Sequence, residues 1–195
     1  MREENILFNN HTALYNEFLQ FEQKIISLAA YLGLILSDYE IDHIAVRVNN
    51  CKTAKSYLEL FVKYGVILSD NIVNGRVIYL IKLHQPLVLA GQKVQIIELP
   101  FPNGKIYPQE SWEHIEIVIP FLAKESTIEW IERIKKQFLL NQMSELSVKV
   151  DEPKVDGEIL PNPSIALSFA DKTQNHSCIK VHPYSIEEII EVNLK

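Results

Sequence analysis

Two segments far apart in the chain share a pattern that predicts an internally repeated fold. Residues 41–48 read IDHIAVRV and residues 112–119 read WEHIEIVI, so each contains an acidic residue, a His, an Ile, any residue and an aliphatic residue in that order. Side chains two residues apart on a strand point the same way, which places His114 and Glu116 on one face and Glu113 on the other. We therefore expect two similar modules that face each other, with a site between them.

The composition indicates a folded protein whose main partner is not nucleic acid. The 195 residues are 47% hydrophobic, a usual fraction for a globular protein, and can form one large domain or two small ones. The formal net charge is −6, and no run of basic residues provides the positive patch that phosphate binding requires.

No segment of the sequence indicates membrane insertion or secretion. No apolar stretch reaches the roughly 18–20 residues of a membrane span, and the first residues, MREENILFNN, lack the basic and apolar regions of a secretory signal. Cys51 and Cys178 do not form a CxxC pair, and two cysteines in a chain of this length suggest reduced thiols. We therefore expect a cytoplasmic location.

Residues 1–36 are expected to form an N-terminal helical extension. A helix is expected over residues 12–32, and Gly33 is placed to end it. Its apolar residues recur at spacings of four and three, as one stripe of a helix requires. They are Leu14, Phe18, Phe21, Ile25, Leu28 and Leu32. Packing of this stripe against the chain's own domain is the favoured interpretation, although a signalling or dimerisation helix shows the same pattern.

Residues 37–195 are expected to form a single domain of two modules with the same order of elements. Module one, residues 40–102, reads as a strand, a helix and three strands, at 41–48, about 53–64, 66–73, 76–83 and 92–99. Asn74-Gly75 predicts a tight hairpin turn, and residues 84–91 read as a loop.

A polar connector at residues 103–111 leads into module two, residues 111–195, which repeats this order. Its strand and helix lie at 112–119 and about 127–140, and a capping box of Ser126 and Glu129 opens the helix. Three further extended segments are expected at 144–152, 164–169 and 178–181, with a turn-rich stretch at 153–163 and a last helix from Ser185. The fold class is therefore α+β, with two βαβββ modules.

Several strings resemble one known family in order and spacing. DHIAVR, NGRVIYLIKLH, IIELPFP, YPQESWEHIEIV, LPNPSIAL and IKVHPYSIEEII resemble the bacterial YecM protein family, from about residue 40 to 190. The doubled module with a His on each first strand resembles the vicinal oxygen chelate superfamily of glyoxalases, bleomycin resistance proteins and extradiol dioxygenases. This resemblance implies strongly curved mixed sheets around a cavity, and a divalent metal held by one ligand from the first and one from the fourth strand of each module.

Carried over residue by residue, the resemblance implies metal ligands at His43 and His114 on the first strands and at Glu98 and His182 on the fourth strands. Imidazole nitrogen and carboxylate oxygen suit zinc, nickel, iron, cobalt or manganese, so the identity of the metal stays open. A single His on a strand is more often a hydrogen-bonded interior residue, but four matching positions favour a metal site.

Glu116 is the main rival for a ligand role, because it lies on the same face as His114. Its alternative roles are a general base beside the metal and a hydrogen-bond partner of a ligating His.

Three basic residues share inward faces by the same alternation: Arg47, Arg76 and Lys82. A charge on a buried face is costly unless it is paired. These cations are expected either to hold an anionic substrate or to pair with Glu98, Glu116 or Asp42.

The favoured function is that of a metal-dependent isomerase, lyase or oxygenase acting on a small, anionic, oxygen-bearing molecule, with Glu116 as candidate base. A protein that binds a metal or a small ligand without catalysis is the alternative, because a chelating pocket and a catalytic one use the same residues. A module that binds a partner through its N-terminal helix is a third, weaker interpretation. The chain is expected to be a monomer or a dimer.

Overall fold

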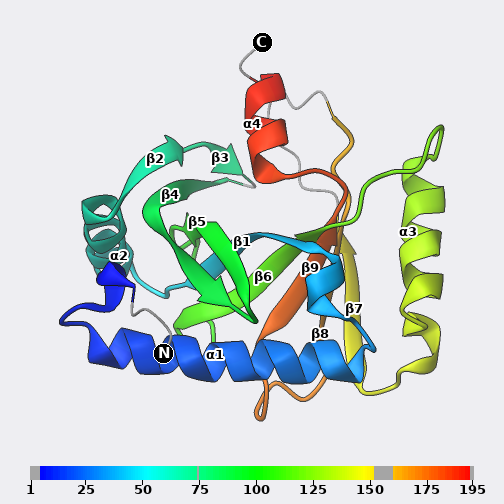
Figure 1. Ribbon diagram of the computed structural model, residues 1–195, viewed down its shortest axis with the longest axis horizontal. Coiled ribbons are helices and arrows are strands. Elements are labelled where there is room, and N and C mark those ends of the chain that lie inside the picture. The colour runs from blue at the N-terminus through cyan, green and yellow to red at the C-terminus, as the bar shows by residue number, and fades with distance from the viewer. Residues whose placement is uncertain (1–4, 74, 152–159, 194–195) are drawn as a thin grey trace.

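The computed structural model describes residues 5–73, 75–151 and 160–193, and Figure 1 shows how their elements are arranged. The N-terminal segment contains the helix α1 (Thr12–Tyr31), which lies between two short 3-10 helices, Ile6–Phe8 and Leu36–Asp38. In the described residues no helix is long and apolar enough to cross a membrane.

Module one has the predicted order of elements, with one short strand added. It consists of β1 (Glu40–Arg47), α2 (Cys51–Lys63), β2 (Gly65–Ser69), β3 (Ile72–Val73), β4 (Arg76–Leu89) and β5 (Gln92–Pro100). Val73 pairs with Arg76 across the predicted hairpin turn, where Gly75 has a φ of +76°. Asn74 of that turn lies outside the described residues.

The prediction of a loop at residues 84–91 is wrong. Strand β4 continues to Leu89 and pairs again with β5, with Leu87 opposite Val94, and the chain reverses only at Ala90 and Gly91. Both turn residues have positive φ, 49° and 81°, as a two-residue hairpin turn requires. The strand continues past Pro86 because the register shifts between Lys82 and Leu87, an irregularity at which the ladder tolerates a proline.

Module two repeats the order. It consists of β6 (Ser111–Val118), α3 (Thr127–Gln137), a 3-10 helix (Leu140–Gln142), β7 (Leu146–Asp151), β8 (Ser164–Phe169), β9 (Cys178–His182) and α4 (Ile186–Asn193). The capping box at Ser126 is confirmed, since its hydroxyl accepts from the Glu129 amide while Glu129 accepts from the Ser126 amide. Most of the predicted turn-rich stretch, residues 152–159, lies outside the described residues.

The sheet has an internal two-fold pattern centred on β1 and β6. Its strand order is β2-β4-β5-β1-β6-β9-β8-β7, and β3 pairs with β4. The two first strands run antiparallel to each other, and each runs parallel to the last strand of its own module, β5 or β9. This arrangement confirms the α+β class with two βαβββ modules, which is the vicinal oxygen chelate fold.

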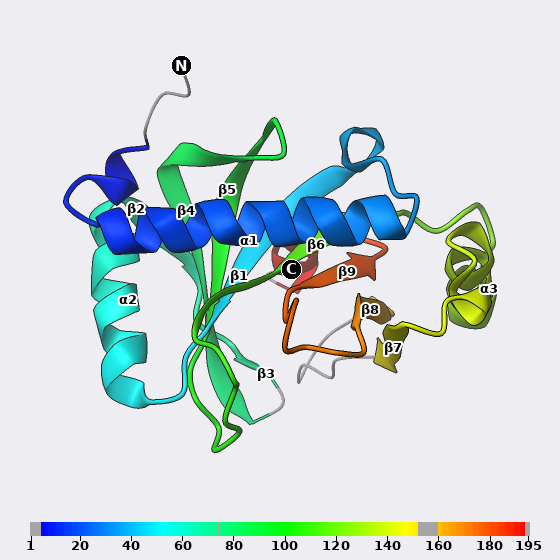
Figure 2. The ribbon, with the colours of Figure 1, turned by 90° about the horizontal axis from the view of Figure 1, so that it is seen from below.

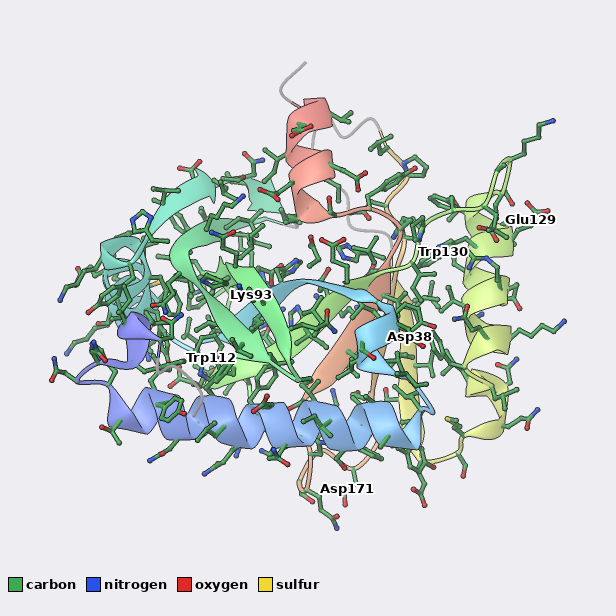
Figure 3. All side chains as sticks on the ribbon, viewed as in Figure 1. Asp38, Lys93, Trp112, Glu129, Trp130 and Asp171 are labelled. Carbon is green, nitrogen blue, oxygen red and sulfur yellow. The ribbon has the colours of Figure 1, made fainter. Side chains whose placement is uncertain are left out.

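Helix α1 and helix α4 lie on opposite sides of this sheet (Figure 1). Helix α1 contacts β6 and β9, and Figure 2 shows it crossing the strands. Its predicted apolar stripe is buried, and Trp112 at the start of β6 packs against the rings of Phe18 and Phe21 and donates to the Leu14 carbonyl at 3.3 Å. Figure 3 labels Trp112 and the second buried tryptophan, Trp130, which belongs to α3.

Candidate metal centre

Two histidines and two glutamates converge in the middle of the sheet. His43 lies on β1, Glu98 on β5, and His114 and Glu116 on β6, so three adjacent strands provide all four side chains. One ligand atom from each residue lies within 4.8 Å of the other three. The Nε2 atoms of His114 and His43 are 3.2 and 3.6 Å from Oε1 of Glu116. Donors around one ion at about 2.0–2.2 Å are spaced similarly.

Two register shifts in the β1–β6 pair position the acidic residue that precedes each His. Ile41 and His43 pair with Ile117 and Glu116, which leaves Asp42 as an extra residue on β1. Ala45 and Val46 pair with His114 and Trp112, which leaves Glu113 as an extra residue on β6. Such bulges change the direction in which side chains point, and they are frequent beside functional sites.

The bulge at Glu113 corrects the expectation that this residue faces away from His114. Alternation holds only while the ladder is regular, and one extra residue lets consecutive side chains approach the same region. Glu113 Oε2 therefore lies 2.6 Å from His114 Nδ1. The same bulge turns Trp112 to the side of α1, although alternation alone would place it with His114.

Each His is oriented by the carboxylate beside it. Asp42 Oδ2 is 2.7 Å from His43 Nδ1, as Glu113 is close to His114 Nδ1. Because Nδ1 donates to a carboxylate, Nε2 is the nitrogen that each ring presents to the cluster, the arrangement found in metal sites. Among the residues that the structure describes, the buried Nε2 of His43 has no hydrogen-bond partner, so the residues present fit a metal ion, which would satisfy this nitrogen.

The charges of the centre also fit a divalent cation. Four carboxylates and two cations meet there: Asp42, Glu98, Glu113, Glu116, Arg47 and Lys180. Metal ligation requires both imidazoles to be neutral. In that state two negative charges remain, and a buried excess of this kind is costly unless a cation offsets it.

The pKa values of the cluster follow from the same charges. Burial alone would lower the pKa of His43, but Glu116, Asp42 and Glu98 outweigh it and raise that pKa well above its usual value. Burial would raise the pKa of Glu98 and Glu116. His43, whose Nε2 lies 3.8 Å from Glu98 Oε2, and the nearby cations Lys180 and Arg47 hold the pKa of Glu98 well below its usual range, and Lys180 and His43 do the same for Glu116. Both glutamates are therefore ionised at neutral pH.

His182 lies beside the group of four and not in it. The position in module two that matches Glu98 is Lys180: Ala45, two residues after His43, pairs with Glu98, and Glu116, two residues after His114, pairs with Lys180. His182 pairs with Val118, further along β9. Its Nδ1 is 3.5 Å from Glu116 Oε2, and burial lowers its pKa.

The three basic residues proposed for substrate binding have different surroundings. Arg47 is buried and paired, with Nη1 3.0 Å from Glu98 Oε1 and Nε 3.3 Å from Glu113 Oε2. Lys82 pairs with Glu187 of α4 at 2.6 Å. In the described part of the chain no carboxylate pairs with Arg76, whose Nη1 donates to the Tyr107 hydroxyl at 3.3 Å. Of the three, Arg76 is the one left available for an anion.

The centre lies at the wall of a cavity of about 490 Å³, within the usual size range for small-molecule sites. The cavity is lined by residues from each of the strands β1 to β9, from the connector between the modules, and by Ile186, Ile189 and Ile190 of α4. Helix α4 is tied to the centre, because the Ile186 amide donates to both Asp42 oxygens at 3.1 and 3.2 Å. The cluster is therefore accessible to a small molecule.

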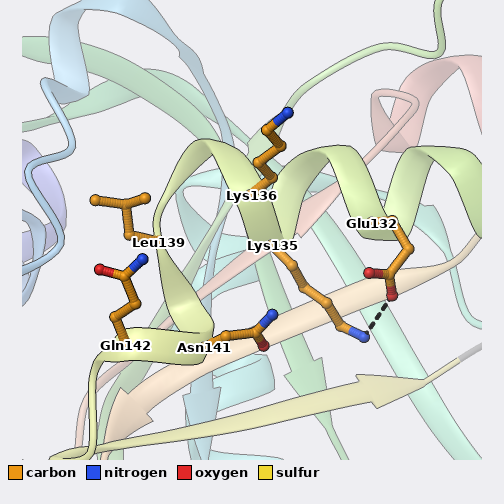
Figure 4. Close-up of a pocket in the computed structure, with 6 residues that line it drawn as sticks. All are labelled: Glu132, Lys135, Lys136, Leu139, Asn141 and Gln142. Atoms are coloured by element: carbon orange, nitrogen blue, oxygen red, sulfur yellow. Dashed lines mark hydrogen bonds and ion pairs between the residues drawn. The ribbon is translucent and has the colours of Figure 1, made fainter.

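A second depression, at the C-terminal end of α3, lacks these features. It has a volume of about 350 Å³ and is lined by surface side chains, including the ion pair of Glu132 and Lys135 (Figure 4). No metal-ligand group of the kind found at the centre involves its residues, among those that the structure describes.

Sequence reasoning missed Asp42, Glu113 and Lys180 as members of the site. The acidic residue before each His is visible in both copies of the repeat, and it was the available signal for Asp42 and Glu113. Lys180 shares the alternation of His182, but only the pairing of β6 with β9 shows that it is the counterpart of Glu98.

Comparisons with known proteins agree on one family. The family model described as YecM protein matches residues 10–193. The chain is 59% identical over 184 residues to an uncharacterized protein of Haemophilus influenzae, covering 94% of this chain and 95% of that one. It is 38% identical over 171 residues to Protein YecM of Escherichia coli, covering 88% and 87%. A solved structure described as Structural Genomics, Protein EC4020, matches with a TM-score of 0.79, 32% identity and 98% coverage of both chains.

Proposed function

The chain belongs to the YecM protein family, and from the geometry of its buried centre we propose that it binds a divalent metal and acts as an isomerase, lyase or oxygenase on a small, anionic, oxygen-bearing molecule. The observation that carries the proposal is the convergence of His43, Glu98, His114 and Glu116 within 4.8 Å, at the wall of a cavity.

The donor set limits which metals suit the centre. His43, His114 and Glu98 supply two imidazole nitrogens and a carboxylate oxygen, and Glu116 adds a second carboxylate oxygen where it binds the ion. These ligand types suit zinc, nickel, iron, cobalt or manganese. When bound, such an ion supplies Lewis-acid chemistry, by which substrate oxygens are held and a developing oxyanion is stabilised.

Glu116 is the residue we assign to proton transfer. It is ionised at neutral pH because Lys180 and His43 hold its pKa down, and its two oxygens face Lys180 Nζ at 2.7 Å and His182 Nδ1 at 3.5 Å. A carboxylate oriented in this way can accept a proton from a substrate held at the centre. Arg47 fixes Glu98 through their 3.0 Å contact, and the isoleucines of α4 shield part of the cavity from water.

One observation supports the alternative, a protein that binds a metal without catalysis: the number of donors in the group. Four protein ligands complete the tetrahedral shell of a structural site, whereas a catalytic site keeps one position open. The role of Glu116 therefore separates the two functions: as a ligand it closes the centre, and as a base it leaves a position for substrate.

Three measurements test the proposal. Elemental analysis of purified protein, reloaded after treatment with a chelator, should give one divalent ion per chain. Cobalt-substituted protein should then change its visible absorption spectrum when a small chelating anion such as oxalate enters an open position, and turnover of dicarbonyl, catechol and hydroxy-acid substrates should follow. Metal binding with an unchanged cobalt spectrum and no turnover would support the closed site, and absence of metal binding would contradict both functions.

A further inference from the structure

A second polar group lines the cavity on the side of the connector between the modules. Arg76, at the start of β4, and Lys105 and Tyr107, on the connector, all line it. The hydroxyl of Tyr107 accepts from Arg76 at 3.3 Å, and the ammonium of Lys105 lies 4.9 Å from the centre of the Tyr107 ring. Both cations therefore meet at one tyrosine. Figure 2 shows the connector (green) beside the hairpin of β3 and β4.

Tyr107 is held firmly enough to organise such a group. Its backbone exchanges two hydrogen bonds with the Asn49 side chain, at 2.7 Å from the Tyr107 amide and 2.9 Å to its carbonyl. Asn49 lies two residues after the end of β1, so the end of a central strand fixes the connector at this point. A site on a rigid element keeps its geometry better than one on a free loop.

The two cations have no carboxylate partner in the part of the chain that the structure describes. Asp151 lines the same cavity but pairs with Lys149 at 2.7 Å, and the carboxylate of Glu110 on the connector accepts from the Asn49 amide. An unpaired Arg and Lys at the wall of a cavity leave strong hydrogen-bond donors directed at whatever enters it.

Arg47 lies next to both this group and the metal centre. Arg47 lies 5.9 Å from the Tyr107 ring and donates to Glu98 of the centre at 3.0 Å. A small molecule in the cavity is therefore able to contact both the metal centre and this second group. The two differ in chemistry, because the metal centre binds a cation and the second group offers cations.

We propose that Arg76, Lys105 and Tyr107 form an anion subsite that holds a carboxylate or phosphate group of the substrate, at the end remote from the oxygens that face the metal centre. The subsite deepens the proposed function, and only its link to the metal rests on that function. The substrate class is then an acid with two ends, one that chelates and one that is anionic.

Inorganic phosphate is the first probe, titrated calorimetrically into protein treated with a chelator. Arg76→Gln and Lys105→Gln each remove one donor, and Lys93→Gln is the matched control: it also removes one positive charge, from an exposed side chain of β5 that does not line the cavity. We expect Arg76→Gln to weaken phosphate binding about tenfold and Lys105→Gln severalfold, as befits charge-assisted hydrogen bonds in a partly exposed site. Lys93→Gln should bind phosphate as the parent does. Acetate in place of phosphate shows whether a carboxylate suffices.

Equal phosphate affinity in Arg76→Gln and Lys93→Gln would overturn the subsite, because the effect would then reflect net charge alone. Lys105→Gln keeps the test valid if Arg76→Gln fails to fold, since Lys105 is exposed. A two-ended probe, phosphoglycolate, should bind metal-loaded protein more tightly than phosphate does, and Arg76→Gln should weaken phosphoglycolate binding by about the same factor as phosphate binding. If the protein binds no metal but its phosphate binding still depends on Arg76, the subsite is supported and the proposed function is contradicted.

Discussion

Glu98 and Lys180 occupy equivalent positions in the two halves of the sheet but carry opposite charges. Each lies on the last strand of its module, opposite the residue two places after the first-strand His. In module two the carboxylate is instead on the first strand, as Glu116 where module one has Ala45, and Lys180 Nζ binds it at 2.7 Å. The group of His43, Glu98, His114 and Glu116 thus has two carboxylates. In module two an ammonium occupies the position that matches Glu98.

The first prediction follows from this exchange. Lys180→Glu places a carboxylate at the counterpart of Glu98, and we expect metal affinity to rise at least about tenfold, because a cation beside the ion becomes a further anionic donor. The metal-free variant should be less stable, since three carboxylates then repel one another. Competition with a chromophoric chelator measures the affinity. Lys180→Gln, which removes the charge alone, is the control, and equal affinities of the two variants would rule out a ligand position there.

A second prediction decides between Glu116 and His182 as metal ligand. If Glu116 is a ligand, Glu116→Gln should weaken metal binding by about a hundredfold or more. If Glu116 is a base beside the ion, the loss should stay within the range of about 10–100-fold that changes around a ligand cost. His182→Asn should weaken it less, since His182 faces the second oxygen of Glu116 at 3.5 Å. The same competition assay tests both variants. The reverse order of losses would make His182 the ligand.

A third prediction concerns the residue that orients His43. Asp42→Asn keeps an oxygen to accept the Ile186 amide but loses the negative charge beside Nδ1. We expect about 10–100-fold weaker metal binding, measured against Glu40→Gln, an exposed carboxylate on the same strand. Unchanged affinity in Asp42→Asn would show that the bulge has only a structural role.

A fourth prediction tests whether residues 1–36 are part of one cooperative domain. Phe18 of α1 is 3% exposed and packs on Trp112 with ring centroids 5.2 Å apart. Phe18→Ala should lower the free energy of unfolding by about 3–5 kcal/mol in a single transition. Ile26→Ala on the same helix, 39% exposed, should cost far less. Two separate transitions in urea, one unaffected by Phe18→Ala, would make the N-terminal segment an independent unit.

A fifth prediction concerns thiol reactivity and its dependence on pH. Burial, with Glu113 nearby, raises the pKa of Cys178 to about 12. At pH 8 only about one thiol in ten thousand is then a thiolate, so iodoacetamide should modify Cys178 roughly a hundredfold more slowly in the folded protein than in urea. The rate should rise with pH up to that pKa, as long as the fold persists. Mass spectrometry separates Cys178 from the exposed Cys51, and equally fast modification of Cys178 in folded and unfolded protein would contradict the prediction.

Local patterns in the sequence were sufficient for the architecture. Alternation at the two His-bearing strands, the apolar stripe of α1 and the capping box at Ser126 each report on residues close together in the chain. That His43, Glu98 and His114 meet was implied by the resemblance to the vicinal oxygen chelate superfamily, which the repeated module supports. The error at residues 84–91 arose where His84 and Pro86 interrupt the alternation while pairing with β5 continues the strand.

The composition of the centre was decided by the tertiary structure. Two bulges bring Asp42 and Glu113 beside the histidines, the pairing of β6 with β9 puts Lys180 in the position expected for a ligand, and ion pairing leaves Arg76 available while it occupies Arg47. The physical reason is that alternation assigns a side chain to a face only within a regular ladder. The position of a bulge, and the residue that lies opposite a given side chain, both depend on two strands together. They are therefore determined only when the strands pair.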